Sequence, residues 1–530
     1  MGKNKLFSVF VLSALLLGLL VMVLSNAAAP VSAQGGNTHE IVFTIPVGKE
    51  GVQYEGENVP EMLTWGPKAF TVAPDRSFWI ADTVGNRLLH YSSKGDLLGM
   101  IYLEGHVVGA GDLEVAASDI LVLSQAAMPP KVVRLALDGT VLASYELPKG
   151  LRLEDGLSGI ALGDQGEVLV EREGGAYVSQ LVDARGKMAP APLDGYVHAG
   201  QLYTARPADM TAEDTTRGYI TAGDRRIEVA VTNSLGGLRL LGVNPDGSFY
   251  VIAEEVVVSG TIQVDQTVRH YDAAGELLGL ARVPLAEQYT DVEQGLVVGP
   301  DGAVYALITR PDRVEVQRLR FSKELKSILP AAPVEMSVQS EGRVIAPLAC
   351  RSRDDMINTA SGYVTNMKYL SATNTDGTCA GRGKPRYIGG AGTYSSVAYD
   401  WNGWDTVSGY NGYMYPNTYQ AGDINTAGWE SCSRGTDCSG LVSRAWDLSS
   451  KKDTYGLNNV SWKLSSTSDL LRGDIMNRAG THVVLFLSFG PNGIYDYEST
   501  TDWSYDRVVC VYRSWGLLSG YEPRRYNDVC

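Results

Sequence analysis

Short hydrophobic stretches alternate with polar turns between residues 40 and 326, and this pattern predicts a long series of β-strands. One unit, a Pro-Asp turn followed by an apolar run, occurs at residues 73–82 and again at 244–252 and 299–307. The run after each turn is short and contains aromatic and β-branched residues, as strands do. The first half of the chain is therefore predicted to repeat one strand-turn-strand unit.

A second repeated unit gives the period. His-Tyr-Ser-Ser-Lys-Gly-Asp-Leu-Leu-Gly at 90–99 returns as His-Tyr-Asp-Ala-Ala-Gly-Glu-Leu-Leu-Gly at 270–279. The spacing of the units is near the 40 to 50 residues of a β-propeller blade. We predict about six blades, beginning near residues 67, 111, 157, 195, 236 and 291. A lone strand at 39–47 is expected to complete the last blade and close the ring.

The segment Asp82-Thr83-Val84-Gly85-Asn86-Arg87 resembles the NHL class of propellers. The resemblance implies a binding surface for a protein, peptide or glycan. His90 and His270 occupy equivalent repeat positions, so a recurring structural role is favoured over a metal pair.

The N-terminus has the pattern of an export signal. Lys3 and Lys5 precede an apolar run from residue 6 to 24, and Val31-Ser32-Ala33 forms a small-residue cleavage site. We predict a signal peptide at 1–33, with an uncleaved anchor as the alternative. The mature chain is then expected to be secreted, extracellular or in the cell envelope of a bacterium, with no membrane association after cleavage.

The net charge of -15 is unevenly distributed. Residues 350–530 hold 17 Lys and Arg against 18 Asp and Glu, whereas the rest of the chain holds 28 against 42. An acidic N-terminal half argues against nucleic acid as a partner. We predict a propeller at 38–329, a linker at 330–348 that begins with Pro-Ala-Ala-Pro, and a separable C-terminal domain at 349–530.

The C-terminal region has the pattern of a cysteine nucleophile with its base. The apolar run after Asp437 predicts a helix that Asp437 caps and Cys438 begins, where the helix dipole favours a thiolate. His482 is the single histidine beyond residue 340 and opens an apolar run that predicts a core strand. An imidazole at the start of a strand can meet a thiol at the start of a helix. The alternatives are a disulfide for Cys438 and a structural role for His482.

The residues around this dyad extend the pattern. Asp-Cys-Ser-Gly-Leu-Val at 437–442, Gly-Asp-Ile at 473–475 and His-Val-Val-Leu-Phe at 482–486 resemble the NlpC family of cell-wall cysteine peptidases, which have a papain-like fold. The segment at 394–405 looks like that family's Tyr-x-Trp-Gly-Gly segment, with Asn402 in place of the first glycine.

The resemblance implies that Cys438 is the nucleophile and His482 the general base. It also implies that Tyr399 places a hydroxyl near the nucleophile and that Asp437 and Ser439 bind a free amine of the substrate. A plain helix cap at Asp437 and a core tyrosine at Tyr399 are the competing interpretations.

Glu498 is predicted to orient the His482 ring, because the family's third polar residue lies on the following strand. Pairing Phe489 with Ile494 would place Tyr497 and Ser499 on the face of His482 instead. The assignment of Glu498 therefore requires a β-bulge, which we expect in the glycine-rich turn at 490–493. The alternative is a solvated strand glutamate.

All six cysteines lie beyond residue 340, and a free Cys438 leaves two disulfides and one thiol. Cys510 with Cys530 and Cys350 with Cys379 are the favoured pairs, with Cys379 and Cys432 as the alternative. No metal or other cofactor is expected, because the region has one histidine and no Cys-x-x-Cys pair.

The predicted fold is multidomain: an all-β six-bladed propeller followed by an α+β papain-like cysteine hydrolase domain. The expected function is hydrolysis of an amide bond in peptidoglycan stem peptides or other cell-wall material, with the propeller as the binding or positioning module. An amidase or acyltransferase of another specificity is one alternative. A propeller-based binding or adhesion protein with an accessory C-terminal domain is the other.

Overall fold

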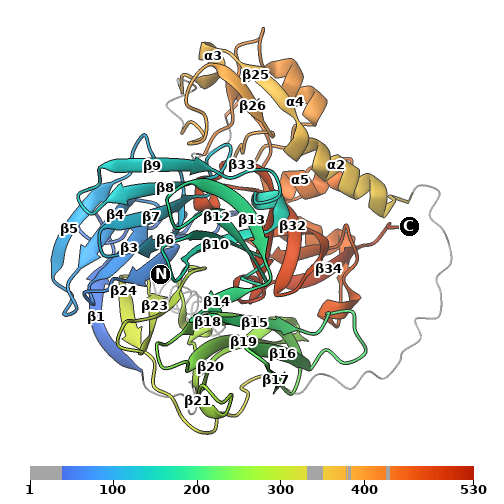
Figure 1. Ribbon diagram of the computed structural model, residues 1–530. Helices are drawn as coiled ribbons and strands as arrows, with labels where there is room; N and C mark the ends of the chain where they lie inside the picture. Colours follow the sequence, from blue (N-terminus) through green and yellow to red (C-terminus); the bar gives the residue numbers. More distant parts are fainter. Residues whose placement is uncertain (1–38, 331–349, 378, 380–382, 425–429) are drawn as a thin grey trace, which may run out of the picture. The chain divides into compact units, whose positions relative to one another are not determined.

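The computed structural model describes residues 39–330 and 350–530, apart from residues 378, 380–382 and 425–429 (Figure 1). The predicted signal peptide at 1–33 and nearly all of the predicted linker lie outside the described residues. The fold is mostly β, with six four-stranded antiparallel sheets before residue 320 and a six-stranded sheet near the C-terminus. The predicted blades are therefore present.

The first three blades have the following strands. Blade one contains β2 (Ala69–Val72), β3 (Phe78–Asp82), β4 (Arg87–Tyr91) and β5 (Leu97–Tyr102). Blade two contains β6 (Ala110–Val115), β7 (Asp119–Ser124), β8 (Lys131–Ala136) and β9 (Val141–Glu146). Blade three contains β10 (Leu157–Leu162), β11 (Val168–Arg172), β12 (Tyr177–Val182) and β13 (Met188–Leu193).

The other three blades complete the propeller. Blade four contains β14 (Tyr196–His198), β15 (Gln201–Pro207), β16 (Arg217–Ala222) and β17 (Arg225–Ala230). Blade five contains β18 (Ser234–Val243), β19 (Phe249–Ser259), β20 (Thr261–Tyr271) and β21 (Leu277–Arg282). Blade six contains β22 (Leu296–Val298), β23 (Val304–Thr309), β24 (Arg313–Arg318) and β1 (Glu40–Pro46).

Blade six joins the two ends of the propeller sequence. β1 pairs antiparallel with β24, with Ile45 opposite Val314, and both of these side chains are fully buried. β2 of blade one contacts β22 of blade six, and a bridge joins Ala69 to Gln294. The predicted closure by the lone N-terminal strand is confirmed.

The C-terminal region contains one antiparallel sheet in the order β29-β34-β30-β31-β32-β33. Its strands are β29 (Ser461–Lys463), β30 (Ile475–Arg478), β31 (His482–Gly490), β32 (Gly493–Thr500), β33 (Arg507–Ser514) and β34 (Glu522–Tyr526). Two short pairs lie outside it, formed by β25 (Met367–Leu370) with β26 (Gly392–Ser395) and by β27 (Gln420–Ala421) with β28 (Ser433–Arg434).

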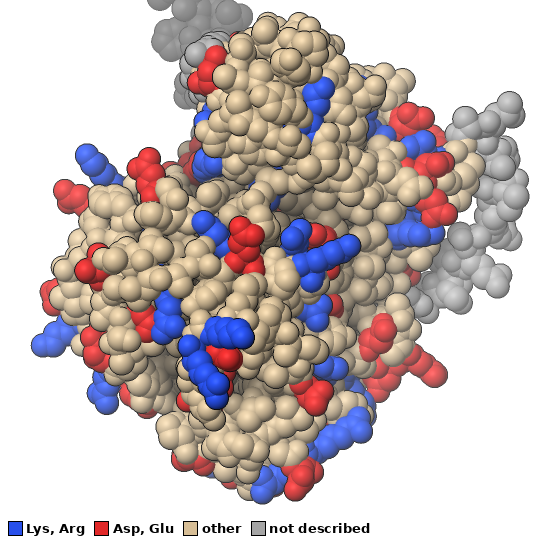
Figure 2. All heavy atoms as spheres, turned by 45° about the horizontal axis from the view of Figure 1, so that its top comes forward, with Lys and Arg blue, Asp and Glu red and all other residues tan. Residues whose placement is uncertain are grey.

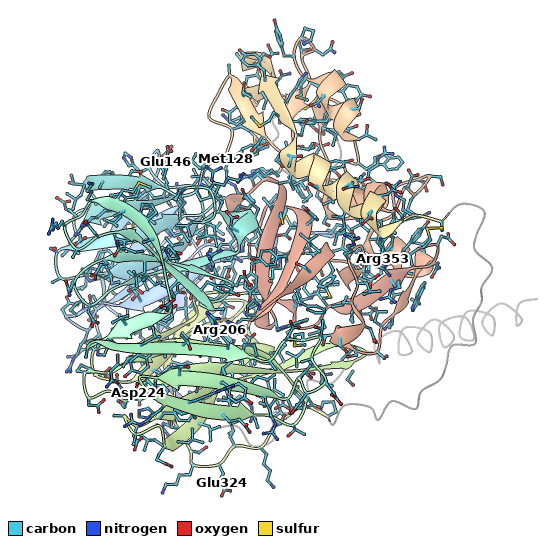
Figure 3. The ribbon with its side chains drawn as sticks, turned by 45° about the vertical axis from the view of Figure 1, so that its right-hand side comes forward. Met128, Glu146, Arg206, Asp224, Glu324 and Arg353 are labelled. Carbon is cyan, nitrogen blue, oxygen red and sulfur yellow. A yellow bond between two sulfur atoms is a disulfide. The ribbon has the colours of Figure 1, made fainter. Side chains whose placement is uncertain are left out.

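Helices cover one face of this sheet. α2 (Arg353–Thr365) and α5 (Cys438–Ala445) contact its strands. α3 (Ala372–Thr375) contacts the short strands β25 and β27 instead, and the remaining helices are α4 (Val407–Tyr413) and α6 (Thr454–Leu457). α2 packs against α5 and β33. Arg353, at the start of α2, donates to Asp474 at 2.9 Å and ties the helix to the segment before β30 (Figure 3).

The other face of the sheet packs against the propeller. One buried cluster joins Val256 and Ile262 of blade five to Val484, Phe486 and Trp515. A second cluster joins blades two and three to Trp503, Tyr505 and β33.

A buried ion pair of 2.8 Å also crosses this boundary, between Lys68 and Asp502. The expectation of two separable domains does not fit this shared core, because separation would expose both clusters.

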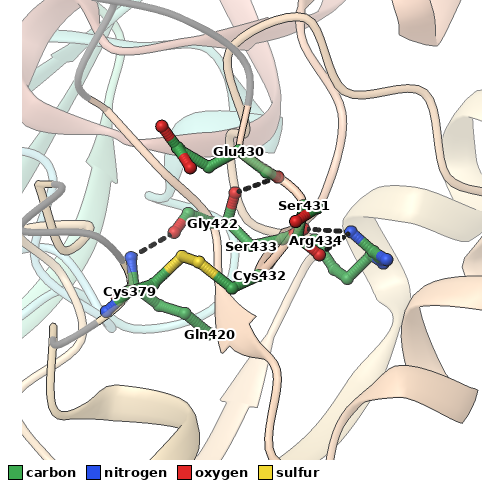
Figure 4. Close-up of a disulfide and its surroundings, with 8 residues drawn as sticks. All are labelled: Cys379, Gln420, Gly422, Glu430, Ser431, Cys432, Ser433 and Arg434. Carbon is green, nitrogen blue, oxygen red and sulfur yellow. Dashed lines mark hydrogen bonds between the residues drawn. A yellow bond between two sulfur atoms is a disulfide. The ribbon is translucent and has the colours of Figure 1, made fainter.

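The disulfides differ from the favoured pairs. Cys350 is bonded to Cys530, which joins the start of the described C-terminal region to the end of the chain. Cys379 is bonded to Cys432, the pair kept as the alternative (Figure 4). The favoured pairs were wrong because sequence spacing does not report which strand ends meet in space. Cys438 is free, as predicted, and the leftover thiol is Cys510.

The described residues contain no helix that combines the length and the apolar character needed to cross a membrane. On the face shown in Figure 2, acidic and basic side chains are interspersed over the surface.

Candidate functional site

The fold places Cys438 at the first position of α5, as the sequence predicts. The Asp437 side chain caps the helix by accepting from the Gly440 N–H at 2.7 Å. The Cys438 side chain is buried, with 1% of its surface exposed. α5 packs against β31 and β32, so the thiol lies over the strands that carry His482 and Glu498.

His482 begins β31, also as predicted, and its side chain is buried. The backbone N–H of Val483, the residue that follows His482, lies near enough to the Cys438 sulfur to lower the pKa of the thiol. Among the residues that the structure describes, no hydrogen bond joins the sulfur to the imidazole. The His482 Nε2 atom is 2.6 Å from Glu498 Oε2, which leaves Nδ1 as the ring nitrogen free to serve the thiol.

A β-bulge brings Glu498 to His482. Phe489 is opposite Ile494 as expected, but the register shifts between Phe486 and Ser488, so that Leu485 is opposite Tyr497. The shift moves the Glu498 side chain onto the same face of the sheet as His482. The bulge lies within β31 rather than in the glycine-rich turn, so the expected position of the bulge was wrong.

Arg513 of β33 holds the other oxygen of Glu498, Oε1, and also lies 3.4 Å from Asp496. Burial by itself raises the pKa of Glu498, but Arg513 and His482 lower it to about 2. Burial and Glu498 raise the pKa of Asp496 well above its usual range. Glu498 is therefore the charged member of this buried group, and it fixes the imidazole as an ionised acceptor.

The resting thiol differs from the expected thiolate. Burial, followed by the carboxylates of Asp437 and Glu61, raises the pKa of Cys438 well above its ordinary value. Lys451 and the Val483 N–H act in the opposite direction but do not balance the rise. Cys438 is therefore a protonated thiol at neutral pH, because two carboxylates and a dry environment outweigh the helix terminus.

Asp437 and Ser439, the predicted amine-binding pair, already hold an ammonium group of the protein. The Lys451 Nζ atom is 2.9 Å from Asp437 Oδ2 and 3.2 Å from Ser439 Oγ. Its third partner is Asn402, at 3.2 Å, which stands where the related motif has glycine. Burial lowers the pKa of Lys451, but Asp437 raises it above its ordinary value overall. Lys451 therefore stays charged in this position.

Tyr399 is buried and forms a parallel bridge with Thr436, directly before Asp437. Burial raises the pKa of Tyr399 well above its usual range, and the nearby Asp437 and Cys438 raise it further. The fold thus brings all six predicted site residues into one neighbourhood. Their chemical roles remain predictions.

The sequence analysis missed Lys451, Arg513 and Glu61. Lys451 lies beyond the end of α5 and Arg513 on the last strand but one, so neither has a local motif to mark it. Glu61 comes from the propeller half of the chain. Arg513 directly follows the apolar run at 508–512, and a basic residue at the end of such a run is the signal that could have been used.

The repeated histidines of the propeller have a structural environment. The His90 ring stacks on Trp79 at 4.0 Å between centroids, and the His270 ring stacks on Tyr250 at 4.2 Å. In the described part of the chain, no group of three or more His, Cys, Asp or Glu side chains is placed to hold a metal ion.

Comparisons with known proteins give only distant similarity. No family model matches the chain, and no curated protein matches it significantly. A streptogramin B lyase structure is 14% identical, covers 51% of this chain and 97% of its own, and has a TM-score of 0.29. Virginiamycin B lyase from Staphylococcus aureus is 14% identical, covers 48% of this chain and 95% of its own, and has a TM-score of 0.30. The structure of the RRP9 WD40 repeats is 10% identical, covers 52% of this chain and 100% of its own, and has a TM-score of 0.31. At these scores the matches carry no argument about function.

Proposed function

We propose that the chain is an exported bacterial cysteine hydrolase whose papain-like C-terminal region cleaves an amide bond in peptidoglycan stem peptides. The observation that supports it best is the buried pair of His482 and Glu498 beside the start of the helix that carries Cys438. This is the arrangement of a nucleophile, a base and a group that orients the base.

The proposed reaction begins from the protonated thiol. Substrate binding brings the scissile carbonyl to Cys438 while His482 takes the thiol proton at Nδ1. Glu498 stabilises the imidazolium that forms. The sulfur attacks the carbonyl carbon, the imidazolium protonates the leaving amine, and water then hydrolyses the thioester. The backbone N–H of Cys438 is a donor for the oxyanion.

The two disulfides support an oxidising, extracellular compartment, because such bonds persist where thiols are not kept reduced. The propeller is proposed to bind or position cell-wall material, with a protein or glycan ligand. No nucleic acid partner and no cofactor are proposed.

The test is digestion of purified muropeptides by the full chain, with products identified by mass spectrometry. Wild-type protein should release defined fragments that a Cys438→Ala variant does not release. Equal product from both proteins would refute the use of this cysteine.

A second function, a propeller-based binding protein, is favoured by one observation. The Cys438 side chain is 1% exposed, so the resting site is closed to substrate. Binding of muropeptides without turnover, in wild type and Cys438→Ala alike, would support this second function. An amidase or acyltransferase on another substrate would turn over other amides but leave muropeptides intact.

A further inference from the structure

The connection between β1 and β2, residues 47–68, reaches from the propeller to both sides of the cysteine site. Glu55 pairs with Arg386 at 2.8 Å, and Arg386 in turn binds Asp506 at 2.7 Å. The Asp506 carbonyl accepts from the Tyr399 N–H at 2.9 Å. The segment is thereby connected to the side of the site that carries Tyr399.

Glu61 connects the same segment to the side that carries His482. Its Oε2 accepts from the Thr454 N–H at 2.9 Å, and its Oε1 accepts from the Thr454 hydroxyl at 2.6 Å. The Glu61 N–H donates to the Gly480 carbonyl at 3.0 Å. The Gly480 N–H donates to the Thr454 hydroxyl at 2.6 Å, which closes the cluster. Gly480 lies in the turn that leads directly into His482.

The backbone of Glu61 is itself unusual. Its φ is 60°, in the left-handed region that costs a non-glycine residue about 1 to 3 kcal/mol. Such a conformation persists where surrounding contacts fix it, and here contacts on the backbone and the side chain do so. No ion pair neutralises Glu61 among the described residues, whereas Asp437 is paired with Lys451.

We propose that Glu61 of the propeller is a positioning residue of the Cys438 site, which holds the turn before His482 and adds a negative charge beside the thiol. The propeller then forms part of the reactive centre rather than only an attached binding module. The inference rests on the proposed use of Cys438 as the nucleophile, but its test requires no substrate.

The thiol is surrounded by several charged or titratable groups besides Glu61. They are Asp437 at the cap of α5, Lys451 after that helix, Tyr399 on the neighbouring segment, and His482 with Glu498 on β31 and β32. Asp437 and Glu61 both oppose a thiolate, and Lys451 favours it. Removing the charge of Glu61 while leaving the other groups in place should therefore make the thiolate easier to form.

The experiment measures the alkylation rate of Cys438 by iodoacetamide in the full chain between pH 6 and 11. Mass spectrometry of the Cys438 peptide separates its signal from that of the free Cys510. We expect Glu61→Gln to lower the midpoint of the pH profile by about half a pH unit or more, the scale of one nearby charge in a partly dry site. Glu61→Ala removes the same charge and serves if the glutamine variant does not fold.

Two controls separate the effect of the Glu61 charge from a general disturbance of the structure. Glu57→Gln removes a carboxylate from the same segment, where Glu57 accepts from the Tyr289 hydroxyl of the propeller at 3.4 Å, and should leave the midpoint unchanged. Glu61→Asp keeps the charge and should retain the wild-type midpoint. An unchanged or raised midpoint in Glu61→Gln, or a wild-type Cys438 that resists alkylation at every pH, would overturn the inference. A wild-type protein that alkylates as expected but cleaves no muropeptide would refute the proposed function alone.

Discussion

Replacement of Glu498 by glutamine tests the buried charge that orients His482. The variant keeps the shape of the side chain but removes the negative charge between Arg513 and His482. The pKa of Glu498 falls from an ordinary 4.5 to about 2 in the folded protein. A difference of roughly 2.5 units at about 1.4 kcal/mol each corresponds to about 3 to 4 kcal/mol of folding free energy.

The pH dependence has a defined sign. A carboxyl whose pKa is lowered by folding stabilises the native state above its unfolded pKa. That stability is lost as the pH falls from about 4.5 through about 2. We expect Glu498→Gln to reduce the free energy of unfolding by about 3 to 4 kcal/mol at pH 7, with the difference from wild type shrinking below pH 4.5.

Urea titrations at pH 7, 5, 4 and 3, followed by tryptophan fluorescence, measure this difference. Tyr497→Phe is the matched control, because Tyr497 neighbours Glu498 but is opposite Leu485 on the helix side of the sheet. Tyr497→Phe should lower the free energy of unfolding by about 1 kcal/mol or less, and this difference from wild type should not vary across this pH range. If Glu498→Gln lowers the free energy of unfolding by less than about 1 kcal/mol at pH 7, or by an amount that does not vary with pH, Glu498 is not the stabilising buried charge.

The same variant tests catalysis. If Glu498 stabilises the imidazolium, Glu498→Gln should lower kcat on muropeptides by about 100-fold or more with a smaller effect on KM. A silent Glu498→Gln beside an inactive Tyr497→Phe would show that the orienting residue is misassigned.

Three further outcomes are expected. Cys438→Ala should reduce muropeptide hydrolysis by at least about 1000-fold while its melting temperature stays close to that of wild type, and residual turnover above that level would count against the nucleophile. Lys451→Met should free the Asp437 carboxylate, so that a stem peptide with a free amino terminus binds more tightly than its N-acetylated form. Calorimetry in the Cys438→Ala background measures the two affinities. Equal affinities would exclude Asp437 from amine recognition. A fragment of residues 345–530 should aggregate or bind a hydrophobic dye, since it exposes Phe486 and Trp515; a monomeric, dye-free fragment would show that the two regions fold independently.

Much of the local structure was predictable because its signals lie close together in the sequence. The repeated Pro-Asp turns and the repeated unit at 90–99 and 270–279 predicted the blades, and the leftover strand β1 indicated the closure of the ring. Asp437 before an apolar run predicted the start of α5, and Cys438 remained free as expected. Each of these features depends on hydrogen bonds and side-chain patterns within a few residues or on a regular repeat.

The tertiary structure decided everything that depends on distant segments meeting. A single bulge between Phe486 and Ser488 placed Glu498 rather than Tyr497 beside His482, because one extra residue reverses which face a strand side chain occupies. The disulfide partners were fixed by which loop ends approach within bonding distance.

The charge environment of Cys438 likewise depends on Lys451 and Glu61, one from beyond the helix and one from the propeller. The sequence alone predicted the main elements and the position of Cys438 at the start of a helix. Only folding determined the electrostatic surroundings of that residue, because burial and through-space charge have no local pattern in the sequence.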